Sequence, residues 1–245
     1  MKKLCSCLLI LTYLTSCSDD IDTNVIDSQN AISATATNGS ANRIAGEMPA
    51  NSDNPFENVG HVYDEMLTAY YASGALPTGI AAITANVKTV GDATAGYSAL
   101  KGSSYRDVQQ EWISYIISHP TTCIADIVNG TGLSASAKIS LAAFISNVDV
   151  MSHKETDFLP IYNFICDYET AILANPLLTA KDKKIILTVT SISRYSLSKA
   201  KKRPKKNTDP DWTVFIGNLT AGTYGGDNDA AEAIATALVT GIAQN

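Results

Sequence analysis

The sequence predicts an all-α fold, a single multi-helix domain of six to eight helices over residues 54–245. Apolar residues recur at the three- and four-residue spacing of one helical face, first at Phe56, Val59, Tyr63, Met66 and Tyr70. Residues that start and stop helices bound the periodic segments. Strand-like alternation is poor. Only Ile185 to Ile192 alternates cleanly, and its flanks are helical.

The first helix is predicted to begin at Asn54, with Asn54 as its N-cap, Pro55 at the first helical position and Glu57 completing a capping box. His61 and Glu65, together with Asp64, fall largely away from the apolar stripe. We therefore expect the stripe to face the core, with His61 and Glu65 mostly exposed.

The same signals mark further helical segments at about residues 79–90, 105–118, 121–129, 134–151, 156–175, 179–199, 211–221 and 228–243, of which 79–90 is weak and 121–129 is short. Over 105–118 the spacing places Val108, Trp112, Tyr115 and Ile116 on one face. Ser134 or Ser136, Thr179 and Asp229 are the predicted helix starts in the second half of the chain.

The amino-acid composition argues against several classes of protein. The 245 residues are 45% apolar, which excludes a wholly disordered chain. The formal charge of −6 gives no basis for nucleic-acid binding, which favours a basic face. Five cysteines in a chain of this length do not make a disulfide-framework miniprotein.

Residues 1–16 have the features of a secretory signal. Lys2 and Lys3 precede a short apolar run over 8–14 that cannot span a bilayer. The run ends in Leu14-Thr15-Ser16-Cys17, which resembles a bacterial lipobox, an aliphatic residue and two small ones before a cysteine. We expect Cys17 to be lipidated and to become the new N-terminus, so that acyl chains hold the protein at a membrane.

The residues after Cys17 indicate a destination. Ser18, Asp19 and Asp20 resemble the acidic export signal of Bacteroidetes lipoproteins, which implies display on the outer face of the outer membrane. Residues 17–53 are rich in Ser, Thr, Asn, Asp and Ala and keep no period of 2 or 3.6. Such a segment buries too little to fold, so we expect the lipidated cysteine to be followed by a disordered tether.

Candidate chemistry is sparse. His61 and Glu65 are four residues apart and could share a metal on one helix face, but we favour a solvated face. Cys123 and Cys166 are either a disulfide or two buried small apolar residues, and the second interpretation is favoured. The basic run from Lys199 to Lys206 is read as a solvated loop rather than a contact with glycans or lipid phosphates.

Three blocks carry a resemblance to a group of uncharacterised Bacteroidetes surface lipoproteins. They are Asn54-Pro55-Phe56-Glu57-x-x-Gly60-x-x-Tyr63-Asp64-Glu65, Ser193-Arg194-Tyr195-Ser196, and the Ala- and Gly-rich tail from Asp227 to Ile242. The tail has fewer glycines than that pattern. The resemblance implies no activity and no site residues.

We therefore expect a surface-exposed outer-membrane lipoprotein that is not an enzyme, needs no cofactor and binds a surface glycan or a protein through its helical domain. One alternative is an envelope hydrolase or metal-dependent enzyme with a site near His61 and Glu65. The other is a membrane-active protein whose C-terminal helix, Ala230 to Ala243, leaves the core; at 14 residues it could not span a bilayer.

Overall fold

The structure is a computed structural model that describes residues 49–244 except 75, 121, 156 and 202–210. The predicted signal peptide, Cys17, Ser18, Asp19 and Asp20 lie outside the described residues. So does most of the basic run, Lys202 to Lys206.

The described part of the chain contains ten helices and no strand, which confirms the all-α prediction with a somewhat higher helix count. The helices are α2 (Glu57–Ala72), α3 (Ile80–Ala93), α4 (Ala95–Leu100), α5 (Gln110–Ser118), α6 (Cys123–Gly130), α7 (Ala135–Lys154), α8 (Phe158–Ala174), α9 (Ala180–Lys201), α10 (Asp211–Gly226) and α11 (Ala230–Ala243).

The largest difference from prediction lies between α3 and α5. Helix α4, a six-residue helix that buries Tyr97, was not predicted. Helix α5 starts five residues later than expected. The connection before α5 is held by long-range bonds. The Gly102 N–H donates to Asp229 (2.8 Å) and the Ser104 hydroxyl donates to the Asn228 carbonyl (2.8 Å). These bonds keep the segment out of the helix.

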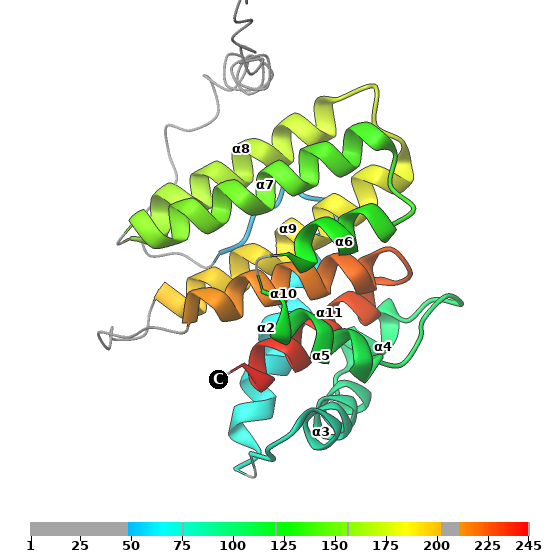
Figure 1. Ribbon diagram of the computed structural model, residues 1–245. Helices are drawn as coiled ribbons and strands as arrows, with labels where there is room; N and C mark the ends of the chain where they lie inside the picture. The colour runs from blue at the N-terminus through cyan, green and yellow to red at the C-terminus, as the bar shows by residue number, and fades with distance from the viewer. Residues whose placement is uncertain (1–48, 75, 121, 156, 202–210, 245) are drawn as a thin grey trace, which may run out of the picture. The chain divides into compact units, whose positions relative to one another are not determined.

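Figure 1 shows α7 and α8 lying along each other, with α9 and α10 beneath them, then α2 and α11, and finally α3, α4 and α5. Helix α9 contributes to two apolar clusters. Leu187 and Leu197 pack with α7 and α8, whereas Ile192 and Tyr195 pack with α2, α3 and α11. Helix α9 is therefore the element on which the two halves of the core meet.

Every residue of α9 from Ile185 to Ser198 is buried, although many are polar. Several hydroxyl groups donate back to a carbonyl of the preceding turn. Thr190 bonds Leu187 (3.1 Å) and Ser193 bonds Val189 (2.7 Å). A Ser or Thr that bonds its own helix needs no outside partner, so it can be buried at small cost.

The predicted starts of α7 and α9 are confirmed. Ser134 Oγ accepts from the Ala137 N–H, and Thr179 Oγ1 accepts from the Asp182 N–H (3.1 Å). Asp182 accepts from the N–H groups of both Ser134 and Thr179, at 2.8 and 3.0 Å. Burial by itself would raise the pKa of Asp182, but these hydrogen bonds outweigh it and lower the pKa. One carboxylate thus ties two helix starts together.

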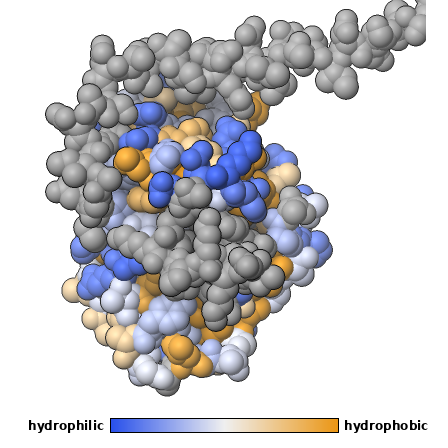
Figure 2. Space-filling model, turned by 90° about the vertical axis from the view of Figure 1, so that its left-hand side faces the viewer, coloured by the Kyte–Doolittle hydropathy of each residue, from blue (hydrophilic) through white to orange (hydrophobic). Residues whose placement is uncertain are grey.

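The C-terminal helix lies inside the domain. Ile234, Leu238 and Val239 of α11 are buried in the cluster formed with α2 and α3. Asp229 caps α11 as predicted, accepting from the Ala231 N–H (2.8 Å). Within the described ranges, no helix combines the length and apolar character needed to cross a membrane. On the face in Figure 2, hydrophilic and hydrophobic residues intermix wherever grey atoms do not cover them.

Candidate functional site

The apolar stripe of α2 faces the core as predicted. Val59, Tyr63, Met66 and Tyr70 are buried, and Phe56 is partly buried. His61 and Glu65 are exposed, also as predicted. Among the residues that the structure describes, no three His, Cys, Asp or Glu side chains come together in a way that could hold a metal ion.

The other acidic residues near His61 contact different helices. Asp64 pairs with Lys199 of α9, with 3.0 Å between carboxylate oxygen and ammonium nitrogen. Glu57 pairs with Arg194 of α9 and accepts a hydrogen bond from the Tyr195 hydroxyl (2.8 Å). The structure therefore does not gather His61 with Glu57 or Asp64 into one site.

The predicted capping box at Asn54 is wrong. Helix α2 begins at Glu57, and no side chain caps its first turn. Asn54 Oδ1 instead accepts from the Phe56 N–H (2.8 Å), which forms a turn before the helix. Glu57 does not reach back to Asn54, because its carboxylate is taken by Arg194. A long-range ion pair outcompetes the local cap.

Arg194 organises a buried polar cluster, the Arg194 cluster, which comprises Arg194, Tyr195, Glu57, Glu169, Asn51 and Asn54. Arg194 Nε donates to Glu169 (3.2 Å), and its two terminal nitrogens bond Glu57 and the Pro49 carbonyl. The amides of Asn51 and Asn54 both donate to Glu169, each at 2.7 Å. Glu169 is therefore satisfied on both oxygens.

The cluster brings together parts of two blocks that carried the family resemblance. Asn54 and Glu57 belong to the first block, and Arg194 and Tyr195 to the second. The sequence analysis did not single out Glu169 or Asn51, which lie 118 residues apart and bond each other directly. A buried acidic position on the apolar helix α8 was the only available signal for Glu169.

The side chains of Arg194 and Glu169 have 0% exposed surface. Burial alone would lower the pKa of Arg194, but the charges of Glu169 and Glu57 outweigh it and raise the pKa. Burial, and then the hydrogen bond to Glu57, raises the pKa of Tyr195. The guanidinium thus stays charged, and the cluster is closed to a substrate from solvent. It acts by joining α2, α8 and α9.

Gly60 allows this close approach of α2 and α9. A Cβ at this position would lie 2.7 Å from the Ser191 carbonyl oxygen, inside any normal contact distance. The Gly60 N–H instead donates to Ser191 Oγ (2.9 Å), and that hydroxyl donates to the Glu57 carbonyl (3.1 Å). The glycine of the first resemblance block is therefore a packing residue.

A row of four aromatic side chains lies on the surface formed by α5 and α10. We call it the aromatic row, and it comprises Tyr224, Trp112, Tyr115 and His119. Tyr224 and Trp112 have ring centroids 5.1 Å apart, Trp112 and Tyr115 5.7 Å, and Tyr115 and His119 4.6 Å. Each ring thus contacts the next.

The prediction that Val108, Trp112, Tyr115 and Ile116 share one helix face is wrong, because Val108 precedes α5 and only Ile116 of the four is buried in it. Ile113 and Ile116 occupy the buried face of α5, whereas Trp112 remains 36% exposed and Tyr115 is partly exposed. The reason lies in α10, because Tyr224 offers a ring at the surface edge of α5. Stacking on that ring holds the indole at the boundary between core and solvent.

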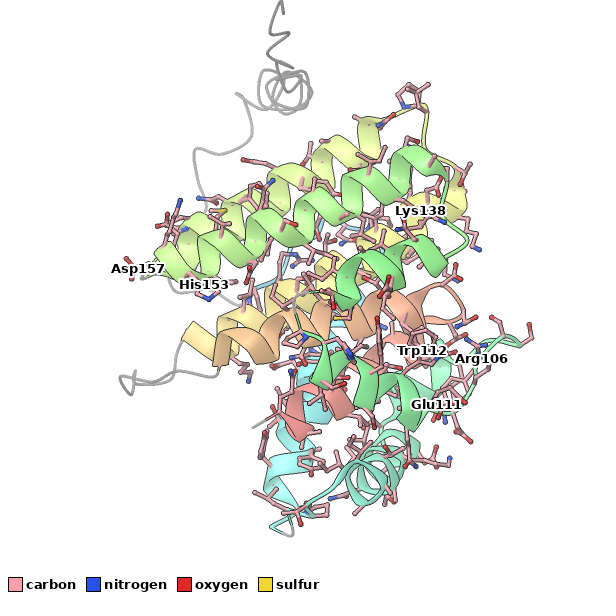
Figure 3. The ribbon with its side chains drawn as sticks, in the orientation of Figure 1. Arg106, Glu111, Trp112, Lys138, His153 and Asp157 are labelled. Atoms are coloured by element: carbon pink, nitrogen blue, oxygen red, sulfur yellow. The ribbon has the colours of Figure 1, made fainter. Side chains whose placement is uncertain are left out.

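Charged groups flank the aromatic row. Figure 3 shows Arg106 and Glu111 beside Trp112, while His153 and Asp157 lie together at the left, where α7 ends and α8 begins. Arg106 pairs with the buried Glu232 (3.3 Å). Tyr115 donates its hydroxyl to Asp126. The row thus carries aromatic faces, one arginine and exposed carboxylates in one place.

The remaining candidates are structural. Cys123 and Cys166 are buried, and the described structure has no disulfide between them. His153 is exposed beside Asp149 (3.5 Å). Comparisons of the chain with known protein families, curated proteins and solved structures find no match.

Proposed function

We propose that this protein is an outer-membrane lipoprotein displayed at the cell surface, and that its helical domain is a non-catalytic module that binds a protein partner. The observation that carries the proposal is Leu14-Thr15-Ser16-Cys17 followed by Ser18-Asp19-Asp20. A lipidated cysteine with two or three acyl chains gives stable anchoring, which one chain does not. A tether then separates the anchor from the folded domain.

The placement of the acidic residues supports a binding role over hydrolysis near His61. Glu57 and Asp64 form contacts with α9 that hold the fold together. A general base or metal ligand must instead reach a substrate. The burial of α11 supports the same proposal over membrane activity, because its apolar side chains already contribute to the core.

The aromatic row supplies the contact surface. Trp, Tyr and Arg are the residue types that dominate binding energy at protein interfaces, and Trp112, Tyr115, Tyr224 and Arg106 occur there together. Glu111 and Asp126 make the surroundings acidic, since the charge of Arg106 is offset by Glu232. The partner should therefore present a basic patch around an apolar centre.

A cross-linking experiment on intact cells tests both the surface location and the binding of a protein partner. A membrane-impermeant reagent should label the wild type and trap a protein adduct. The double variant Asp19→Ala/Asp20→Ala should escape labelling, because a protein without the export signal stays on the inner side of the outer membrane. Trp112→Ser should be labelled but lose the adduct. Ile139→Ser, which removes a 73% exposed apolar residue on α7, serves as the matched control and should keep the adduct.

The anchor is tested separately with radioactive palmitate, which should label the wild type and not Cys17→Ala. Undiminished label in Cys17→Ala contradicts lipidation at this residue. Equal surface labelling of the wild type and Asp19→Ala/Asp20→Ala contradicts the export signal. Adducts that survive Trp112→Ser, or capture of a purified glycan in place of a protein, contradict the proposed partner.

A further inference from the structure

A cavity of about 510 Å³ lies where three segments of the domain meet. The C-terminal end of α2 supplies Tyr70 and Tyr71, the following turn supplies Leu76 and Pro77, and the last turn of α11 supplies Ile242. Cavities of 300–1,000 Å³ with mostly apolar walls are the usual size of small-molecule sites. This cavity shares no lining residue with the aromatic row or the Arg194 cluster.

The turn that forms one wall has a fixed geometry. Gly79, which also lines the cavity, has φ 88°, a conformation that residues with a side chain rarely adopt. A Cβ on Gly79 would meet no atom within 4 Å, so the glycine is required by the backbone and not by packing. The wall at Leu76 and Pro77 is therefore set by the chain direction that this glycine permits.

Tyr70 is the unusual member of the wall. It is 1% exposed, and its hydroxyl has no hydrogen-bond partner among the described residues. Buried hydroxyls in folded proteins nearly always have a partner, because an unpaired one retains its full desolvation cost. Burial, and then the neighbouring Tyr71, raises the pKa of Tyr70, so the phenol keeps its proton at neutral pH. It can therefore donate to a ligand.

The walls also define the chemistry of the ligand. None of the described lining residues is charged, and about half of the accessible wall is apolar, with Leu76, Pro77, Ile83 and Ile242 among its residues. A charged ligand would lose its hydration there without gaining a counter-ion. Tyr71 lies edge-to-face against Tyr70, with ring centroids 5.4 Å apart, and is partly exposed at the cavity. An aromatic or compact aliphatic body suits such walls.

We propose that this cavity binds an uncharged, mostly apolar small molecule that carries one hydrogen-bond acceptor, and that Tyr70 donates to that acceptor. The inference goes beyond the proposed surface role, because the cavity is separate from the partner surface and does not depend on the lipid anchor. The helical domain would then carry a small-molecule site in addition to the proposed partner surface.

Three matched probes test the ligand class on the full chain. Acetophenone carries a carbonyl acceptor on an aromatic body, α-methylstyrene replaces that oxygen with a methylene group, and benzoate replaces the methyl ketone with a charge. Chemical shifts of the Leu76, Ile83 and Ile242 methyl groups report binding at the cavity itself. Acetophenone should bind roughly 2- to 10-fold more tightly than α-methylstyrene, as a net hydrogen bond gives. Benzoate should leave the shifts unchanged.

Three variants assign the effect to Tyr70 and to the cavity. Tyr70→Phe removes only the hydroxyl and should abolish the preference for acetophenone while leaving α-methylstyrene binding unchanged. Tyr71→Phe is the matched control and should keep the preference. Ile242→Trp fills the cavity and should remove both signals, with circular dichroism confirming that the domain is folded.

Several results would overturn the proposal. They are the absence of any shift at the three residues, a preference for acetophenone that survives Tyr70→Phe, and binding of benzoate as tight as that of acetophenone. If Ile242→Trp does not fold, the comparison of Tyr70→Phe with Tyr71→Phe still decides the question. A failure here would leave the surface-partner proposal standing, because that proposal is tested through Trp112.

Discussion

Two helix contacts in this domain achieve close approach by opposite means. Helices α2 and α9 meet through Gly60 and are joined by the ions and hydrogen bonds of the Arg194 cluster. Helices α10 and α11 meet where glycines let their backbones come together. A Cβ on Gly225 would lie 2.6 Å from the Glu232 carbonyl carbon and oxygen.

Two helix pairs that approach equally closely therefore differ in the substitutions that destabilise them. The α2–α9 contact depends on charges that compensate one another, so removing one side chain leaves its partners buried without a counter-ion. The α10–α11 contact depends on missing volume, so adding one methyl group forces the backbones apart. Each contact should therefore be most sensitive to a different kind of substitution.

The largest effect is expected from Arg194→Met. The variant keeps a long side chain but leaves Glu169 and Glu57 without their cation, and breaking a buried pair from one side costs about 3–5 kcal/mol. Urea unfolding should show that loss. Lys88→Met is the control, because it removes an exposed, solvent-screened pair with Asp92 and should leave stability nearly unchanged. Equal losses in both variants would contradict the role of the cluster.

An intermediate effect is expected from Gly225→Ala. Overpacking of a closely packed contact costs about 1–3 kcal/mol, and here the nearest atoms belong to the backbone of α11 and cannot rotate away. Gly130→Ala is the matched control, since a Cβ there meets nothing within 4 Å. That control should be neutral or gain about 0.4–1 kcal/mol. The same urea series measures both, and a neutral Gly225→Ala would show that the helices are free to separate.

The smallest effect is expected from Glu232→Gln, which alters the one acidic side chain buried in α11. Burial raises the pKa of Glu232 above its ordinary value of 4.5, although Arg106 and Asn228 act in the opposite direction. The contribution of Glu232 to stability is therefore full below pH 4.5 and is lost as the pH rises through the folded-state pKa.

Thermal unfolding of wild type and Glu232→Gln between pH 4 and 7 measures this contribution. The stability of the wild type relative to the variant should fall as the pH rises, and the difference between the two proteins cancels the titration of other groups. A relative stability that rises with pH would mean that Arg106 holds Glu232 charged in the folded state. Its pKa would then be lowered by folding and not raised.

The sequence was sufficient for features that are encoded locally. Ser134, Thr179 and Asp229 were predicted as helix starts because a cap involves residues only two or three positions apart. The buried stripe of α2 followed from its period, with His61 exposed as expected. Each of these depends on the geometry of one helix and on nothing distant.

The features that were missed depend on distant residues. Glu57 was assigned to a cap because no local rule could reveal Arg194, 137 residues away. Trp112 was placed on one helix face with Ile116, and its contact with Tyr224 could not be foreseen because the position of α10 was unknown. The cavity at Tyr70 could not be predicted either, since Ile242 reaches it from the far end of the chain.

The segment before α2 has a mechanical consequence. The Pro49 carbonyl is bound by Arg194, the Ala50 carbonyl accepts from Tyr162 (2.6 Å), and Asn51 is fastened to Glu169. Tension that arrives along the backbone from the N-terminal side is therefore delivered to α8 and α9 before it reaches α2. Because all three contacts precede α2 in the chain, a pull from this side must break them before α2 can peel from the domain.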